Sequence, residues 1–309
     1  MENVTPSILI TGGGGFIGSH LAQIAAQMNF LVTCTVKQGS INYRHINDVE
    51  YLEVNFLDES QLRQSLGKRK FTYVVNLLGS ISHKSFFDGG TEIFGTHYLG
   101  TQNLISILDR TKLKKFIQIG SSDEYGDAHF PQHENLRESP QTPYSLGKVA
   151  ATQLIQMLHR TENFPGMVLR PFLIYGPGQS EQRLVPHVII GCLENRGIEL
   201  SSGEQIRDFL FINDAVEAII ECLRNEETSG EVLNLGSGIG VSVKDLAISI
   251  REIIGQGTLI FGSVNPSKRE NKCLISSNEK ITRLTSWTPS TNLQAGLIDT
   301  IESFRKNLI

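Results

Sequence analysis

The chain has 309 residues, of which 39% are hydrophobic and 19% are charged, and its formal net charge is −4. This length is sufficient for a large core, and this composition excludes an intrinsically disordered chain. The small negative charge gives no electrostatic basis for binding nucleic acid or an anionic membrane surface, and no apolar run approaches the ~18 residues of a membrane span.

The first predicted element is a short strand at 8–11, which runs into a glycine-rich turn and an amphipathic helix at 16–28. The turn has the spacing Gly-x-x-Gly-x-x-Gly. Gly12 would permit a tight turn, Gly15 a close approach of the backbone to a pyrophosphate, and Gly18 close packing of helix on strand. The N-terminus of this helix would face the phosphates. The segment therefore predicts a dinucleotide site.

A second predicted strand covers 31–36, and its end bears on the choice of dinucleotide. NAD sites usually place an acidic residue there, on the ribose 2′-hydroxyl. The sequence instead reads Thr35-Val36-Lys37-Gln38. Lys37 suits a 2′-phosphate, so NADP(H) is favoured and NAD(H) is the alternative. Lys37 as a solvated surface lysine is the other interpretation.

Strand-like and helix-like segments continue to alternate up to Pro171. The predicted strands lie at 50–54, 72–78, 115–120 and 166–170, and the predicted helices at 58–67, 91–110 and 142–162. This alternation predicts an α/β fold of the Rossmann type. Its doubly wound parallel sheet would present ligands at the carboxyl ends of the strands.

The pattern changes after Pro171. Glycine and proline interrupt the stretch 177–212, which we expect to be irregular. Helices are predicted at 214–223, 242–254 and 292–306, and a strand at 231–235. We expect a dinucleotide-binding domain formed by 1–176 and 209–236, and a smaller C-terminal substrate-binding lobe formed by 177–208 and 237–309.

A pair of residues on one predicted helix suggests the chemistry. Thr142 and Pro143 suit the start of the helix, and Tyr144 and Lys148 follow one turn apart on the same face. A phenol can exchange a proton with a substrate oxygen while a hydride moves at the adjacent carbon. Its ordinary pKa of ~10 is too high for that task, and a nearby ammonium favours the phenolate. A surface helix pair is the alternative interpretation.

Two small hydroxyl residues, Ser121 and Ser122, follow the predicted strand at 115–120. A serine at this place can donate a hydrogen bond to the same substrate oxygen and stabilise developing charge. Capping of the following turn is the alternative role.

These motifs resemble, in order and over nearly the whole chain, the extended short-chain dehydrogenases/reductases, which include the NAD-dependent epimerase/dehydratase family of nucleotide-sugar enzymes. The resembling segments are Thr11–Gly18, Gly100–Leu104, Ser121–Gly126, Tyr144–Lys148, Arg170–Gly178, Gly203–Phe209 and Asn234–Gly238.

The resemblance implies roles for individual residues. Ser121, Tyr144 and Lys148 would be catalytic, and Arg207 would contact the pyrophosphate of the substrate. The implied cofactor-binding residues are Gly12, Gly15, Phe16, Ile17, Gly18, Lys37, Asn55, Phe56, Leu78, Tyr144 and Lys148. The implied substrate-binding residues are Ser122, Arg183, Arg207 and Arg269, and for each arginine a surface ion pair is the alternative.

Departures from the family pattern bear on the reaction. The 4,6-dehydratases place Asp and Glu directly after the catalytic threonine, where this chain has Ser122 and Asp123. If the alignment is shifted by one residue, Asp123 and Glu124 follow Ser122 in the place of the two acids. This shift requires a deletion before Tyr125. His97 replaces an Asn of the family, where we expect a structural hydrogen bond. Leu173 replaces an Asn of the strand that faces the sugar.

The first residues and the cysteines bear on the location of the protein and on metal binding. The first residues show no secretory signal, so a cytoplasmic location is predicted. The four cysteines are scattered without a Cys-x-x-Cys pair, which predicts free thiols and no metal site.

The resemblance implies a homodimer through a four-helix bundle of 91–110 and 142–162. Their apolar positions would face the partner or the chain's own core: Leu104, Ile105, Leu108, Leu154, Ile155 and Leu158.

The favoured function is an NAD(P)-dependent reductase that delivers hydride to C4 of a nucleoside-diphosphate 4-keto-6-deoxyhexose. The alternative is a nucleotide-sugar 4-epimerase, or a 4,6-dehydratase, with tightly bound NAD. A non-catalytic dinucleotide-binding regulator is the remaining hypothesis, and the intact set of Ser121, Tyr144 and Lys148 speaks against it.

Overall fold

The structure, a computed structural model, describes residues 5–40, 43–264 and 271–307. The chain divides into two compact units. The first combines Met1–Gly126, Arg137–Arg170 and Ile219–Leu233, and the second combines Asp127–Leu136, Pro171–Ala218 and Asn234–Ile309. Arg269, which we expected to bind substrate, lies outside the described residues.

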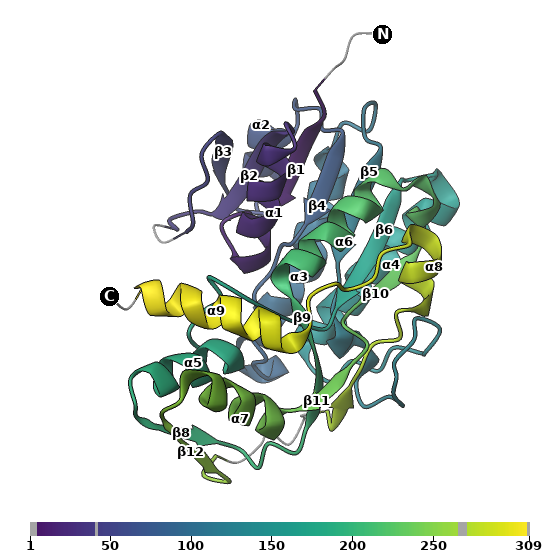
Figure 1. Ribbon diagram of the computed structural model, residues 1–309. Coiled ribbons are helices and arrows are strands. Elements are labelled where there is room, and N and C mark those ends of the chain that lie inside the picture. The colour runs from purple at the N-terminus through teal and green to yellow at the C-terminus, as the bar shows by residue number, and fades with distance from the viewer. Residues whose placement is uncertain (1–4, 41–42, 265–270, 308–309) are drawn as a thin grey trace. The chain divides into compact units, whose positions relative to one another are not determined.

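A seven-stranded sheet forms the centre of the first unit (Figure 1). Its spatial order is β10-β6-β5-β4-β1-β2-β3, and the pairings among β1 to β6 are all parallel. The strands are β1 (Ser7–Thr11), β2 (Leu31–Lys37), β3 (Val49–Val54), β4 (Tyr73–Asn76), β5 (Lys115–Ile119), β6 (Gly166–Pro171) and β10 (Val232–Leu235). The strand order reverses direction at β1, so the ends of β1 and β4 form the switch point where such sheets bind ligands. The predicted Rossmann-type sheet is confirmed.

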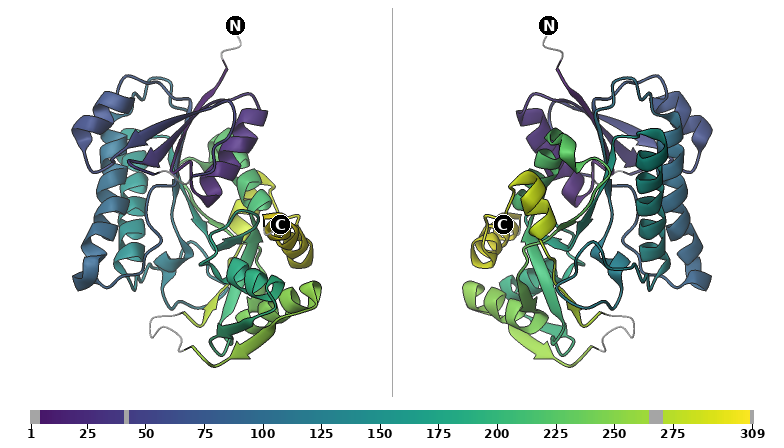
Figure 2. Two further views of the ribbon diagram at one scale, coloured as in Figure 1. Left: turned by 90° about the vertical axis from the view of Figure 1, so that its left-hand side faces the viewer. Right: turned by 90° about the vertical axis from the view of Figure 1, so that its right-hand side faces the viewer.

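Helices cover both faces of this sheet (Figure 2). They are α1 (Phe16–Gln27), α2 (Glu59–Leu66), α3 (Thr91–Ile107) and α4 (Pro143–Glu162), with short helices η1 (Phe86–Gly90), η2 (Ser122–Tyr125) and η3 (Glu226–Thr228). Helices α2, α3 and α4 share one apolar core with the sheet, in which Leu62, Leu104 and Ile155 are fully buried. Burial of each such side chain contributes about 1.5–3 kcal/mol. Helix α1 lies on the opposite face.

Helix α4 carries the predicted reactive pair, and its ends follow from the sequence. The Thr142 hydroxyl accepts the Ser145 N–H at 3.1 Å, and Pro143 occupies the first turn, where its missing N–H has no helical partner. Asn163 ends the helix with a φ of 52°, a conformation that asparagine tolerates better than most residues. The predicted helix is confirmed.

The second unit is built around strand β9 (Ile206–Phe211), which pairs with β7 (Leu173–Tyr175), β11 (Gly240–Ser242) and β13 (Cys273–Leu274). Strands β8 (Gly197–Leu200) and β12 (Thr258–Phe261) form a separate parallel pair. The helices are α5 (Leu184–Leu193), α7 (Val243–Ile254), α8 (Glu279–Thr285) and α9 (Leu293–Asn307). Helix α6 (Ile212–Arg224) begins in this unit and ends in the first.

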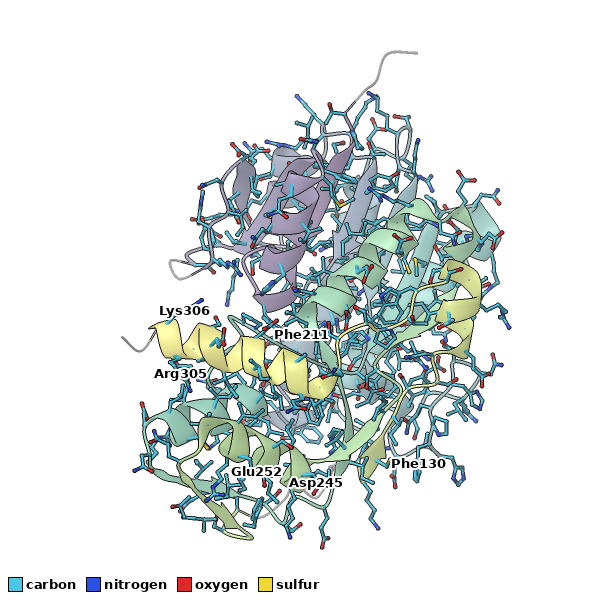
Figure 3. The ribbon with its side chains drawn as sticks, viewed as in Figure 1. Phe130, Phe211, Asp245, Glu252, Arg305 and Lys306 are labelled. Carbon is cyan, nitrogen blue, oxygen red and sulfur yellow. The ribbon has the colours of Figure 1, made fainter. Side chains whose placement is uncertain are left out.

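Charged residues mark the outer faces of these helices. In Figure 3, Asp245 and Glu252 extend from α7, and Arg305 and Lys306 from the last turn of α9. Basic side chains at a helix C-terminus complement the helix dipole. By contrast, Phe211 at the end of β9 is buried.

The expectation that 177–212 is irregular was wrong. The stretch contains α5 as well as β8 and β9. Helix α5 is apolar on nearly every side, so it lacks the polar face by which a surface helix is recognised. Pro186 stands in its first turn, where proline is tolerated, and Gly191 lies so close to Ile198 that a side chain there would collide.

Candidate active site

The glycine-rich turn joins β1 to α1, and three of its glycines have different surroundings. Gly12 has a φ of +65°, which favours glycine. A Cβ at Gly18 would collide with the Gly12 carbonyl oxygen, so Gly18 permits close packing of the helix on the turn. A Cβ at Gly15, which is exposed, would make one close contact within 4 Å among the described residues beyond its chain neighbours, with the Gly12 oxygen at 3.2 Å.

The N-terminus of α1 suits an anion. Gly15 is the residue before the helix and supplies no side-chain cap, and the first turn, which begins with Phe16, Ile17 and Gly18, contains no acidic residue. The N–H groups of a first helical turn attract phosphate through hydrogen bonds and the helix dipole. The exposed Gly15, which carries no side chain, and this helix end together fit the pyrophosphate of a dinucleotide.

Lys37 is the last residue of β2 and is exposed. The turn that follows holds Gln38, Gly39 and Ser40, so no acid follows the strand directly. Glu53 of the neighbouring β3 accepts the Gly39 N–H at 3.1 Å, and its carboxylate therefore holds this turn. The end of β2 presents a cation where NAD sites present a carboxylate.

The other residues expected at the cofactor lie along the same edge of the sheet but serve the fold in visible ways. The Asn55 side chain accepts the Leu57 N–H at 3.0 Å and shapes the turn before α2. Phe56 is buried and its carbonyl accepts a hydrogen bond from Asn103 at 3.0 Å. Leu78, after β4, packs against Gly100 of α3.

Helix α4 brings Tyr144 and Lys148 to the carboxyl end of β5. The Lys148 ammonium lies 5.9 Å from the centre of the Tyr144 ring and donates a hydrogen bond to the Ile119 carbonyl at 2.7 Å. Both side chains are buried. Burial lowers the pKa of Lys148 to about 8, against an opposing effect of Glu124.

Two histidines flank the Tyr144 ring. The His97 ring lies 5.0 Å from it and the His83 ring 5.1 Å, both in edge-on geometry. His97 shares a hydrogen bond with the Ser80 carbonyl at 3.0 Å, and burial together with Lys148 lowers its pKa to about 3, so His97 is neutral. The structural hydrogen bond expected of His97 is present.

His83 was missed by sequence reasoning. Its Nε2 lies 3.9 Å from the Asp123 carboxylate, and the two side chains come from the loop before η1 and from η2. No spacing along the chain links them, so only the folded structure brings this pair beside Tyr144.

Ser121 stands at the start of η2. Its hydroxyl accepts the Asp123 N–H at 3.1 Å, so it caps this short helix. A hydroxyl that accepts one hydrogen bond still has its own proton to donate, and capping therefore leaves the expected donor role available. Ser122 is buried at the first position of the same helix.

Glu124 was also missed by sequence reasoning. Its side chain is fully buried and accepts hydrogen bonds from the Ser121 N–H at 2.9 Å and from the Thr152 hydroxyl at 2.9 Å. Arg170, equally buried, donates to the same carboxylate at 2.8 Å. Glu124 is thus the glutamate that a one-residue shift of the alignment would place after Asp123, and its carboxylate is held by these three groups.

A pocket of about 240 Å³ lies within the second unit. Arg183, the residue before α5, lines it together with Phe209 of β9 and Leu173 of β7, the position where the family has Asn. Its full lining is Leu173, Ile174, Tyr175, Gln179, Gln182, Arg183, Leu184, Val185 and Phe209. The Gln179 side-chain oxygen is buried and finds no protein donor among the described residues.

Arg207 stands two residues before Phe209 on β9, which places both side chains on one face of the strand. Arg207 is buried and its guanidinium donates to the Ile206 carbonyl at 2.8 Å. The neighbouring Asp208 accepts the Ser237 N–H at 2.6 Å and the Gly238 N–H at 3.0 Å. Asp208 thereby fixes the Gly-Ser-Gly loop beside β9.

Other kinds of site find no support in the part of the chain that the structure describes. Within it no group of His, Cys, Asp and Glu side chains is arranged to hold a metal, and no helix there is long and apolar enough to cross a membrane. The four cysteines are free and buried.

Comparison with solved structures shows the same fold in nucleotide-sugar enzymes. A UDP-glucose 4-epimerase of Thermotoga maritima, solved with UDP-glucose, superposes with a TM-score of 0.91 at 25% identity over 98% of this chain and 100% of that one. A UDP-glucuronic acid 4-epimerase of Bacillus cereus, solved with UDP-glucuronic acid and NAD, gives 0.85 at 25% identity over 97% and 99%.

The sequence also matches a nucleotide-sugar dehydratase. It is 29% identical over 269 residues to the dTDP-D-glucose 4,6-dehydratase of Dictyostelium discoideum, a match that covers 80% of this chain and 62% of that relative. The profile of the NAD dependent epimerase/dehydratase family matches residues 8–236, which include the glycine turn, Ser121, Tyr144, Lys148 and Arg207. The expected family is confirmed: the chain belongs to the NAD-dependent epimerase/dehydratase family.

Proposed function

We propose that this protein is an NADPH-dependent reductase of a nucleoside-diphosphate 4-keto-6-deoxyhexose and that it delivers hydride to C4 of the sugar. The observation that carries the choice of a reductase is the exposed Lys37 at the end of β2, with no acid directly after it. A cation there binds the 2′-phosphate of NADPH, and an enzyme that consumes NADPH exchanges its cofactor at every turnover.

The buried groups at the end of β5 carry the acid–base chemistry. The dinucleotide, when bound, supplies the hydride. Tyr144 gives its phenolic proton to the oxygen that forms at C4, and the Ser121 hydroxyl donates a hydrogen bond to the same oxygen. The Lys148 ammonium stabilises the resulting phenolate, because it lies 5.9 Å from the ring.

The second unit contributes the recognition of the nucleotide. Arg207 and Arg183 suit a diphosphate, because guanidinium groups bind phosphate oxygens through paired hydrogen bonds. The apolar Leu173 in the pocket suits a sugar that carries a methyl group better than one with a further hydroxyl, since a hydroxyl against leucine would lose its hydrogen bonds.

A 4-epimerase with tightly bound NAD is the second candidate. The structural relatives favour it, because both are 4-epimerases and one was solved with NAD. It requires the same three catalytic residues, so the nature of the cofactor decides between the two functions.

The deciding experiment is denaturation of freshly purified protein, followed by identification of the released dinucleotide and titration with NADPH and NADH. The reductase predicts little bound dinucleotide and NADPH binding at least tenfold tighter than NADH. The variant Lys37→Ala should remove that preference, whereas the control Lys68→Ala, an exposed lysine beyond α2, should keep it. Near-stoichiometric NAD in the purified protein would instead establish the epimerase or the dehydratase.

A further inference from the structure

The carboxylate of Glu124 is buried and forms hydrogen bonds with the segments that carry the proposed catalytic residues. Its Oε1 accepts the Ser121 N–H at 2.9 Å, and its Oε2 accepts the Thr152 hydroxyl of α4 at 2.9 Å. Gly120 leaves the space for it, since a Cβ there would collide with this carboxylate. The side chain therefore joins the turn that carries Ser121 to the helix that carries Tyr144 and Lys148.

Glu124 is also the buried anion next to a buried cation. Lys148 is taken out of water, and among the described residues its ammonium donates to a neutral carbonyl, that of Ile119. The negative charge of Glu124 opposes the effect of burial and favours the protonated lysine. Such a charge is effective because the surroundings screen it weakly.

The charged groups around Glu124 and Lys148 determine whether the Glu124 charge favours the protonated lysine. Arg170 pairs with Glu124 from β6, and its charge is shared with Glu138, whose carboxylate accepts from Arg170 at 2.7 Å. His97 from α3 is neutral, and His83, whose ring contacts that of Tyr144, lies 3.9 Å from the Asp123 carboxylate. Removal of the Glu124 charge would leave the buried Lys148 without the negative charge that favours its protonated form.

We propose that Glu124 is a positioning residue for the reaction. It orients Ser121 through the backbone N–H, and it holds the proton on the Tyr144–Lys148 pair through its charge. The inference rests on the proposed function, because it assigns a role in the same proton transfer. A carboxylate needed for folding alone would stabilise the protein without changing how the active site titrates.

The test compares two variants with a matched control. Glu124→Gln keeps the shape and removes the charge. Glu124→Asp keeps the charge and withdraws the carboxylate from Ser121. Glu138→Gln is the control, because Glu138 also pairs with Arg170 but makes no contact with Ser121. For each protein, kcat, KM and the alkaline limb of the pH profile are measured with the same nucleotide sugar, and melting temperatures report folding.

We expect Glu124→Gln to lower kcat by roughly ten- to hundredfold and to move the alkaline limb to lower pH by about one unit, with KM little changed. Glu124→Asp should lower kcat but leave the limb in place, and Glu138→Gln should behave as the wild type. An unchanged limb in Glu124→Gln, or an unchanged kcat in Glu124→Asp, overturns the inference.

Failure of the inference is distinct from failure of the proposed function. If the wild-type protein does not turn over any nucleotide sugar, the proposed function fails. If the wild type is active and both Glu124 variants match it at equal folded concentration, only the role of Glu124 fails. If Glu124→Gln does not fold, the Asp variant alone decides the orienting role.

Discussion

At the scale of single residues, the reaction depends on a lysine that is hidden from water. Desolvation disfavours its charged form, and the pKa of Lys148 is lowered to about 8. Below that pH the lysine is protonated and stabilises the Tyr144 phenolate, and above it the support is lost.

Activity should therefore fall as the pH rises through about 8, with the substrate at saturating concentration. The profile of kcat against pH measures this directly. His97 should add no acidic limb within the neutral range, because its pKa lies at about 3. A kcat that stays level far above pH 8 would show that Lys148 keeps its proton or does not act through it.

At the scale of elements, we propose that the glycine turn and the first turn of α1 bind the cofactor. Variants at two of its glycines distinguish an effect on binding from an effect on folding. Gly15→Ala places a methyl group at an exposed position, where its one close contact is the Gly12 carbonyl oxygen at 3.2 Å. The protein should keep its melting temperature, within a few degrees, and lose at least tenfold in dinucleotide affinity, because the methyl group occupies the approach of the pyrophosphate.

Gly18→Ala should behave differently. Its methyl group collides with the Gly12 carbonyl oxygen, and the helix must move away from the turn. Overpacking of this kind costs about 1–3 kcal/mol, so both melting temperature and affinity should fall. Thermal unfolding with and without NADPH measures both effects, and equal melting temperatures for the two variants would refute the distinction.

The elements also show how far sequence patterns predict structure. The alternating strands and helices of the first unit were predicted because their apolar residues follow strand or helix periodicity, and α4 also has a cap at Thr142. Helix α5 was not, because a helix that is apolar on nearly all sides has no period to read. Its burial depends on contacts with β8, α7 and α9, which lie elsewhere in the sequence.

The same limit applies to the active site. Tyr144 and Lys148 were predicted because they lie one helical turn apart. The pairs Glu124–Arg170 and His83–Asp123 were not, because they join segments separated by 46 and 40 residues and leave no mark in local spacing. Single-sequence patterns report neighbours on one element, whereas buried ion pairs are formed by the tertiary fold.

At the scale of the whole molecule, the resemblance leads us to propose a homodimer through α3 and α4. Several apolar residues first considered for that interface belong to the core of the first unit, since Leu104 and Ile155 are fully buried. Leu99 of α3 and Met157 of α4 remain exposed, at 45% and 39%, and we assign the contact to them.

The double variant Leu99→Glu and Met157→Glu should convert a dimer into a monomer, because two charges would be buried at the interface without partners. Leu57→Glu, at another exposed position of the first unit, is the matched control and should stay dimeric. Sedimentation velocity distinguishes the species. A wild-type protein that sediments as a monomer over the accessible concentrations would contradict the proposed assembly.

The central claim is that this family member moves a hydride at a sugar carbon with Tyr144 as the acid. The most direct measurement is the rate of NADPH oxidation on addition of a nucleoside-diphosphate 4-keto-6-deoxyhexose, for the wild type and for Tyr144→Phe. The account predicts turnover by the wild type and a loss of roughly 10²- to 10⁴-fold in the variant, with NADPH binding retained. Equal rates for the two proteins would contradict it.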